Sequence, residues 1–328
     1  MTSLADFASL NHRDNPRFFP DPRGQSPIHQ PYESANARLE LIIMSESSEE
    51  QQQPQASSPR DPALFRAEPV SFVRRGNRLQ GRRASAWERN ADQYVIEPPR
   101  KIADTSVADD FQLDPTEAFG RTAPLVVEIG TGLGECIANA AKDDPERNYL
   151  AVEVYRPGLA QLMLKVESFG ISNVRAVQAN APEVLDVMLD ENSADEIWIF
   201  FSDPWHKPRH HKRRLIKKSF LDKVSRVLKP GGTLRLATDW SNYAEQMRDV
   251  LEEHADFQNQ HPGNLAGEAS NLTKVRREGM EGFDPEPEFI DEQGGWAPRF
   301  ERRILTSFEG KALKAGRLVF DLAYTRVG

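Results

Sequence analysis

Cysteine, long apolar runs and a secretory leader are missing or nearly missing from this sequence of 328 residues. Cys136 is the only cysteine, which excludes a disulfide scaffold and a cysteine-based zinc site. No run of 18 apolar residues occurs, which excludes a membrane-spanning helix, so we expect no membrane partner. The first residues lack the basic stretch and apolar core of a secretory signal, and we expect a cytoplasmic protein.

An excess of positive charge is also absent, because 42 Lys and Arg residues stand against 50 Asp and Glu residues, a formal net charge of -8. Taken alone, this balance argues against a nucleic-acid partner, since phosphate binding needs Lys and Arg. The charge is unevenly distributed, however. Segment 65–101 holds nine basic and four acidic residues, and segment 207–218 holds seven basic and no acidic ones. Two concentrated basic segments within an acidic chain keep a nucleic-acid partner possible.

The chain divides into three parts by composition. Residues 45–62 are of low complexity and nearly free of apolar side chains, so we predict a disordered N-terminal tail over 1–65. Residues 66–112 form a basic N-terminal arm, in which Arg residues accompany Trp87 and Tyr94. This mixture is typical of an RNA-contacting segment, although a solvated linker is the alternative. We assign 113–328 to one folded domain.

Short apolar runs alternate with amphipathic stretches from residue 125 onward. The runs at 125–129, 149–154, 174–178, 196–201, 233–238 and 317–326 predict strands. Segments 157–169 and 215–228 predict helices, the first with Pro157 in its first turn and Gly170 after its end. Strands alternating with helices of this length predict an α/β fold with a parallel sheet covered on both faces.

The first predicted strand ends in a glycine loop, VEIGTGLGE, before a helix. By itself this pattern is typical of a dinucleotide site, an S-adenosylmethionine site or a tight turn. Glu128, two residues before Gly130, would repel a pyrophosphate but could accept from an ammonium group. Glu153 ends the next strand, 21 residues after Gly132, where an acidic side chain reaches ribose hydroxyls, although it could be a solvated strand-end carboxylate. We favour S-adenosylmethionine over NAD, with Gly130 and Gly132 in the cofactor loop.

Polar residues also follow the third and fourth predicted strands. Asn180 could bond the adenine amine or cap the helix that starts near Pro182, and both are compatible. Asp203 follows the fourth strand, at the sheet edge where ligands bind in open α/β sheets. The chain continues as PWHKPRHHKRR, and Lys and Arg bind phosphates while aromatic faces stack on bases. No convergent cysteines or carboxylates accompany the histidines, so we expect no metal.

These residues carry a family resemblance. SDPWHKPRHHKRRL resembles the PDPW-x-K-x-R-H-x-K-R-R segment of bacterial tRNA guanine-N7 methyltransferases, and LATDW (236–240) and TSFE (306–309) extend the likeness over roughly residues 72–326. The resemblance implies a Rossmann-like class I methyltransferase fold, with a mostly parallel seven-stranded sheet, helices on both faces and an antiparallel last strand. It also implies transfer of the methyl group of S-adenosylmethionine to N7 of guanosine 46 in the tRNA variable loop.

The resemblance further implies roles for individual residues. Cofactor contacts would come from Glu128, Glu153, Asn180 and Asp203, and Asp203 would also be catalytic. The substrate nucleoside would be held by Lys207, Asp239, Thr306, Ser307, Phe308 and Glu309, and tRNA by Arg209, His210, His211, Lys212, Arg213 and Arg214. From the residues alone, Asp239 could equally be a helix N-cap, and 306–309 would be an ordinary strand end.

The chain departs from the family pattern at two positions. Asn180 stands where Asp is common, which keeps a hydrogen-bonding oxygen but loses a charge, and Ser202 replaces the first proline. Three alternatives stay open: a class I methyltransferase for another RNA or a small molecule, a non-catalytic RNA-binding relative, and an NAD-dependent oxidoreductase. No obligatory protein partner is inferred. The retained carboxylates Glu128, Glu153 and Asp203 favour an active methyltransferase.

Overall fold

The computed structural model describes residues 78–101, 103–265, 271–272, 289–290 and 293–328. By its internal contacts the chain divides after Pro59, and every described residue belongs to the second unit, Arg60–Gly328. The predicted tail at 1–65 and the first part of the predicted arm therefore lie outside the described residues. The predicted boundaries at 65 and 112 stay predictions.

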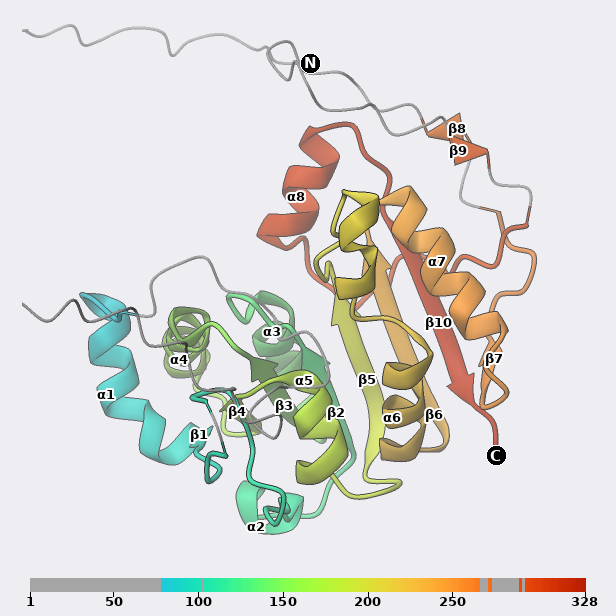
Figure 1. The fold of residues 1–328 in the computed structure, drawn as a ribbon. Helices are drawn as coiled ribbons and strands as arrows, with labels where there is room; N and C mark the ends of the chain where they lie inside the picture. Colours follow the sequence, from blue (N-terminus) through green and yellow to red (C-terminus); the bar gives the residue numbers. More distant parts are fainter. Residues whose placement is uncertain (1–77, 102, 266–270, 273–288, 291–292) are drawn as a thin grey trace, which may run out of the picture. The chain divides into compact units, whose positions relative to one another are not determined.

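An eight-stranded sheet forms the centre of the described chain, in the order β1-β4-β3-β2-β5-β6-β10-β7 (Figure 1). All neighbouring pairs from β1 to β6 are parallel, whereas β10 runs antiparallel to both β6 and β7. The predicted mostly parallel α/β sheet with an antiparallel last strand is confirmed. The strands are β1 (Val95–Ile96), β2 (Leu125–Ile129), β3 (Asn148–Glu153), β4 (Val174–Gln178), β5 (Ala194–Phe200), β6 (Leu228–Thr238), β7 (Phe257–Asn259) and β10 (Phe320–Arg326).

The predicted count of seven strands is wrong, because the sheet has eight. The short strand β1 lies inside the predicted basic arm and pairs in parallel with β4, Val95 opposite Ala176 and Ile96 opposite Val177. Two residues are too few to show the alternation of apolar and polar side chains that marks a strand in a sequence. The extended conformation of β1 is therefore decided by its pairing with β4. A separate two-stranded sheet joins β8 (Asn271–Leu272) and β9 (Phe289–Ile290).

Helices cover both faces of the sheet, as predicted. Residues of α1 (Arg82–Tyr94), α3 (Glu135–Asp143) and α4 (Arg156–Phe169) share one apolar cluster with alternate sheet residues, among them Val126 and Trp198. The opposite cluster contains Val127 and Ile129 together with α2 (Pro115–Phe119), α5 (Ala181–Glu183), the π-helical turn Val184–Met188, α6 (Lys218–Val227) and α7 (Ser241–Glu252). The alternation along β2 sends successive side chains to opposite faces, so both faces of this strand are buried.

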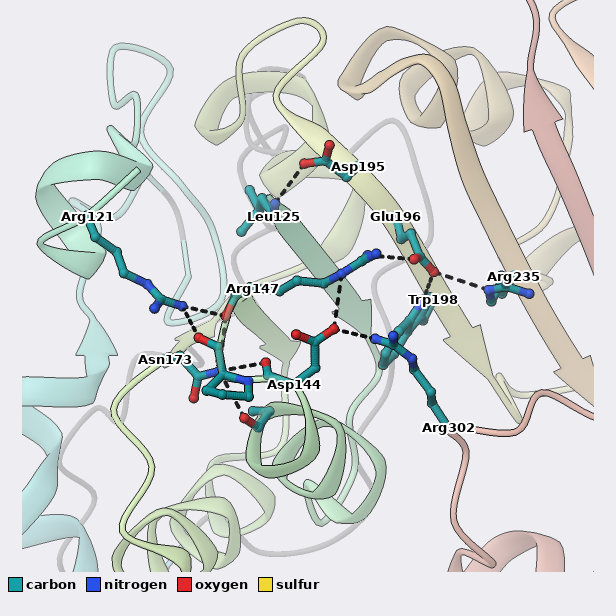
Figure 2. Close-up of polar contacts among 12 residues, drawn as sticks. Arg121, Leu125, Asp144, Arg147, Asn173, Asp195, Glu196, Trp198, Arg235 and Arg302 are labelled. Atoms are coloured by element: carbon teal, nitrogen blue, oxygen red, sulfur yellow. Dashed lines mark hydrogen bonds and ion pairs between the residues drawn. The ribbon is translucent and has the colours of Figure 1, made fainter. Parts of the chain in front are cut away.

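A polar network links β5 and β6 to the end of α3 (Figure 2). The Glu196 carboxylate accepts hydrogen bonds from Arg147 at 2.7 Å, from the indole N–H of Trp198 at 2.9 Å and from Arg235 at 3.2 Å. Asp144 pairs with Arg302 at 2.7 Å, although the two are 158 positions apart. The carboxylates are satisfied by several donors each, which offsets the cost of placing charge beside a buried sheet. The segment before α8 (Ser307–Lys314) is thereby tied to α3.

The carboxyl ends of β2, β3, β4 and β5 meet at one edge, because these strands are parallel. Figure 1 shows α8 beyond this edge, past the end of β5. In doubly wound folds ligands bind at such an edge. Within the described part of the chain, no helix has the length and apolarity needed to cross a membrane.

Candidate functional site

A cavity of about 280 Å³ opens at the carboxyl edge of the sheet. Its walls come from the glycine loop after β2, the ends of β3, β4 and β5, the segment before α6 and the start of α8. The predicted site residues that line it are Glu128, Gly130, Gly132, Glu153, Asn180, Asp203, Arg213, Arg214, Thr306 and Phe308. Most of the predicted cofactor and substrate residues are thus brought to one place.

The glycine loop has a backbone conformation that residue types other than glycine rarely adopt. Gly130, Gly132 and Gly134 all have positive φ, at 75°, 57° and 65°, which favours glycine. Close packing adds a second constraint, because a Cβ atom on Gly158 of α4 would stand 2.1 Å from the carbonyl oxygen of Gly132. The loop and the first turn of α4 therefore approach each other backbone to backbone.

Glu153 ties the end of β3 to this loop. One carboxylate oxygen accepts from the Gly132 N–H at 2.7 Å, and the other accepts from Val154 at 2.8 Å and Tyr155 at 2.9 Å. Burial raises the pKa of Glu153, and these backbone N–H groups oppose the rise. Contact of Glu153 with a ribose stays a prediction, and the structure adds that the same carboxylate shapes the loop.

Three buried polar side chains in the cavity wall have an oxygen atom that finds no hydrogen-bond partner among the described residues. They are Oε2 of Glu128, Oγ1 of Thr131 and Oδ1 of Asn180. The Glu128 side chain belongs to a residue only 4% exposed, and burial raises its pKa to about 8. Unpaired buried oxygens cost free energy, so a cavity with three of them is suited to a ligand that supplies hydrogen-bond donors.

Asn180 occupies the N-cap position of α5, yet its side chain makes no capping bond. The amide oxygen instead remains unpartnered in the cavity wall. The sequence leaves two roles open for Asn180. The residue has the position of a helix cap but does not act as one, and its side chain is available to a ligand.

The backbone around Asp203 is strained. Phe201 and Trp205 flank it with positive φ, at 55° and 48°, a region that costs a bulky residue about 1–2 kcal/mol. Such strain is common at functional sites. Desolvation by the cavity walls raises the pKa of Asp203, and the charge of His206 lowers it. Asp203 therefore lies on a rigid turn whose shape is maintained against a local cost.

Arg214 helps to maintain this turn. Its guanidinium donates to the Pro204 carbonyl at 2.8 Å, to Gln246 at 2.9 Å and to Asn242 at 2.9 Å, and it lies 4.8 Å from the centre of the Tyr243 ring. The residue is 3% exposed. A guanidinium so enclosed favours a positioning role for Arg214, and its predicted contact with tRNA stays a prediction.

The other predicted RNA-binding residues lie on a 3-10 helix, Pro208–Arg213. Arg209, Lys212 and Arg213 are exposed, and Arg213 stacks over Trp205 at 5.0 Å from the ring centre. His210 and His211 are half-buried. The 3-10 helix places Arg213 beside the ring of Trp205 at the cavity wall. The following helix, α6, begins at Lys218, three residues later than predicted.

The segment 306–309 forms the start of α8, whereas its residues alone predict a strand end. Thr306 caps the helix by accepting from the Glu309 N–H, and Ser307 donates through both its N–H and its hydroxyl to Glu135 at 2.9 and 2.8 Å. Phe308 is half exposed and lines the cavity beside Gly132. The first turn of α8 therefore faces the glycine loop.

Glu309 belongs to an ion-pair network instead of the cavity wall. It is 1% exposed and accepts from Arg299 at 2.7 and 2.8 Å and from the fully buried Arg303 at 3.2 Å. Arg303 also pairs with Asp321 of β10 at 2.9 Å. Although burial raises the pKa of Glu309, hydrogen bonds from Arg299 and Arg303 hold it below its ordinary value. Substrate contact by Glu309 stays a prediction.

Asp239 and Lys207 do not line the cavity. Asp239 forms an ion pair with Arg317 at 2.7 Å, and the N-cap of α7 is Trp240, so Asp239 is not the helix cap that the sequence left open. Lys207 is exposed at the start of the 3-10 helix. Both substrate roles stay predictions.

The cavity also contains residues that the sequence did not single out. Thr131, Lys217 and Glu135 line it, together with Trp205, the aromatic residue that the sequence had already indicated. Thr131 could have been noticed between the two glycines of the loop. The bonds between Glu135 and Ser307 span 172 positions, and no local signal reveals them. Within the described ranges, no group of three or more His, Cys, Asp or Glu residues is placed to hold a metal ion.

The sequence is similar to those of known proteins over most of its length. The family model described as "Putative methyltransferase" matches residues 122–279. A tRNA (guanine-N(7)-)-methyltransferase of Arthrobacter sp. (strain FB24) is 52% identical over 297 residues, 84% of this chain and 93% of that protein. A tRNA (guanine-N(7)-)-methyltransferase of Paenarthrobacter aurescens (strain TC1) is 52% identical over 275 residues, which are 79% of this chain and 91% of that protein.

A solved structure of an antibiotic-related methyltransferase aligns with a TM-score of 0.38 and 20% identity, over 64% of this chain and 94% of that chain. The two sequence relatives are far more similar, and each is matched over nearly its full length. The chain therefore belongs to the family of tRNA (guanine-N(7)-)-methyltransferases.

Proposed function

We propose that this protein transfers the methyl group of S-adenosylmethionine to N7 of a guanine in tRNA, at position 46 of the variable loop, and does so in the cytoplasm. The observation that carries the proposal is the set of unpartnered oxygens of Glu128, Thr131 and Asn180 in the cavity wall beside Asp203. The names of the relatives supply the acceptor, tRNA guanine, and the cavity supplies a place for the donor.

The residues of the cavity fit S-adenosylmethionine. Its ammonium group and adenine amine are hydrogen-bond donors, which matches the unpaired oxygens of ionised Glu128 and of Asn180, while the Thr131 hydroxyl can donate or accept. Glu128 would hold the ammonium, and Asn180 would accept from the adenine amine. The N–H groups at the start of α3 and the glycine loop would surround the rest of the molecule, with Gly130 and Gly132 allowing close approach.

Bound S-adenosylmethionine supplies an electrophilic methyl group on a sulfonium. Guanine N7 has a free lone pair and no proton, so the protein need not provide a general base. What the chain must provide is alignment, and a negative charge near the ring, which becomes cationic when methylated. Asp203 meets both needs, because it lies at the cavity on a turn that Arg214 holds through the Pro204 carbonyl.

The acceptor guanine would enter between Asp203 and Phe308, which line the same cavity. The exposed ring of Phe308 offers a stacking face, and the exposed cations Arg209, Lys212 and Arg213 offer contacts to phosphates. RNA recognition commonly combines such stacking with phosphate contacts. The loop and nucleotide would then be selected by the shape of the tRNA around the base.

Replacing Asp203 tests the proposal. We expect Asp203→Asn and Asp203→Ala to lower methyl transfer to tRNA by roughly 100-fold or more, because the charge that stabilises the methylated ring is lost. The assay uses labelled S-adenosylmethionine and unmodified tRNA, followed by mapping of the methylated nucleoside. Thermal unfolding should stay close to wild type, since Asp203 is exposed.

Asp110→Asn is the matched control. It makes the same Asp-to-Asn change as Asp203→Asn, at an exposed residue that does not line the cavity. Wild-type turnover by the Asp203 variants would refute the catalytic role. Binding of tRNA by the wild-type protein without any methylated product would instead indicate a non-catalytic RNA-binding relative.

A further inference from the structure

A second concave surface lies between α1 and α4, separate from the cofactor cavity. It is an open groove of about 660 Å³, lined by Gln80, Arg82, Arg83, Gln161, Leu164, Lys165, Ser168 and Phe169. Three of these side chains are cationic, three others are uncharged hydrogen-bonding groups, and none is acidic. A groove of this composition is chemically matched to a polyanion with hydroxyl groups.

The cations of the groove are available to a ligand. Arg82 is exposed and Lys165 half-buried, and neither forms a hydrogen bond or ion pair within the described residues. Among the residues that the structure describes, Arg83 donates only to Gln161, through Nε at 3.0 Å, which orients its guanidinium with the outer nitrogens available to a ligand. By contrast, Arg89 on the same helix is already paired with Glu167 at 2.8 Å. The groove therefore concentrates the uncompensated charge of α1.

The walls of the groove are firmly packed. Ala86 and Trp87 of α1 are buried against residues of α4, and the guanidinium of Arg156 lies 4.6 Å from the centre of the Trp87 ring. The opposite wall, α4, begins three residues after Glu153, and its Gly158 packs against the glycine loop. One helix thus contributes its first turn to the cofactor site and its later residues to the groove.

We propose that the groove between α1 and α4 binds the sugar–phosphate backbone of the tRNA substrate, at a place separate from the methylated nucleotide. The inference rests on the proposed function for the identity of the polyanion. Arg82, Arg83 and Lys165 contact phosphates, and Gln80, Gln161 and Ser168 bond ribose hydroxyls and phosphate oxygens. The groove contributes affinity, whereas the cavity at the sheet edge selects the base.

The salt dependence of tRNA binding tests the groove. Each phosphate contact contributes about 0.7 to 0.9 to the slope of log K against log salt concentration. We expect Arg82→Gln/Lys165→Gln to reduce the magnitude of that slope by about 1.4 to 1.8 and to weaken tRNA binding roughly tenfold near physiological salt. The Kd for S-adenosylmethionine, measured in parallel, should stay within about twofold and shows that the variant is folded.

Arg89→Gln is the matched control for the single variant Arg82→Gln. Both remove one positive charge from an exposed position on α1, but only Arg82 lines the groove. We expect Arg82→Gln to reduce the magnitude of the slope by the value of one phosphate contact, about 0.7 to 0.9. Arg89→Gln should leave the slope unchanged. Equal changes of slope in the two variants would overturn the proposal that the groove binds tRNA, because they would show a general effect of the protein's charge.

The outcomes separate the groove from the proposed function. The Arg82→Gln/Lys165→Gln variant could keep the wild-type slope and affinity while the wild-type protein methylates tRNA at guanine N7. That result overturns the proposal that the groove binds tRNA and leaves the proposed function standing. Absence of that methylation by the wild-type protein overturns the proposed function. Loss of slope in the double variant, with methylation by the wild type, supports both.

Discussion

Glu128 combines an unusual charge state with a central place in the site. It lies on β2 at 4% exposure, and burial raises its pKa from 4.5 to about 8. Because the folded-state value exceeds the unfolded-state value, the folded protein keeps a proton that the unfolded chain loses above about pH 4.5. The resulting stability is fully present below that pH and is lost as the pH rises through about 8.

We therefore expect Glu128→Gln to change how the stability of the ligand-free protein depends on pH. Between pH 5 and pH 8.5, the free energy of unfolding of wild type should fall by about 2–4 kcal/mol relative to Glu128→Gln, because only the wild type must bury an ionising carboxyl. Denaturant unfolding at a series of pH values measures the difference. Glu146→Gln, at an exposed position, is the control and should follow wild type.

The same proton links pH to cofactor binding. Pairing with an ammonium requires ionised Glu128, so binding of S-adenosylmethionine at pH 7 should release a proton from the protein. Calorimetry in buffers of different ionisation enthalpy measures that release. Equal proton release by wild type and Glu128→Gln would show that Glu128 does not pair with the ammonium group.

At the scale of elements, two carboxylates hold the first turn of α8, one on α3 and one on α8 itself. Glu135 of α3 accepts both bonds from Ser307, and Glu309 is fixed by Arg299 and Arg303. Phe308 stands between these anchors and faces the glycine loop. The position of its ring thus depends on contacts that join α8 to the cofactor loop and to the sheet.

We expect Glu135→Ala to raise the KM for tRNA and for S-adenosylmethionine by roughly tenfold, because α8 loses its link to the cofactor helix and both ligand surfaces lose a fixed partner. Ser307→Ala keeps the backbone N–H donor and should have a smaller effect, and Glu135→Gln, which can still accept, should restore much of the loss. Steady-state kinetics measure KM and kcat separately. An effect on thermal stability with unchanged KM would contradict a positioning role.

At the scale of the whole molecule, the net charge of -8 conceals the surfaces that would meet RNA. The exposed cations Arg209, Lys212 and Arg213 lie on one 3-10 helix, of which Arg213 lines the cofactor cavity. Arg82 and Lys165 line the groove. Local contacts with phosphates, and not the total charge, set the salt dependence of nucleic-acid binding.

Removal of residues 1–65, which hold five basic and nine acidic residues, changes the net charge from -8 to -4. We expect the slope of log K against log salt concentration for tRNA to be steep in the full chain and unchanged in the 66–328 protein, because the phosphate contacts are retained. Fluorescence anisotropy with labelled tRNA over a salt series measures both. A shallower slope after truncation would show that the N-terminal tail contributes cationic contacts.

Much of the fold and part of the cavity lining could be predicted, because their signals are local. The strands at 125–129 and 174–178 were found at the same bounds as β2 and β4, since buried parallel strands are continuous apolar runs between turn residues. Asp203 was found because polar residues that follow a parallel strand reach the ligand edge of the sheet. The two-residue strand β1 was missed because it has no pattern of its own.

The sequence by itself determined the strand and helix alternation, the glycine loop and the presence of Glu128, Asn180 and Asp203 at strand ends. These depend on backbone preferences and on periodicity within about ten residues. Only the tertiary structure decided that Arg214 is enclosed beneath the Asp203 turn, that Glu309 is paired with Arg303, and that cations from α1 and α4 share a groove. Burial and pairing of charges depend on which distant segments meet, and no local pattern contains that information.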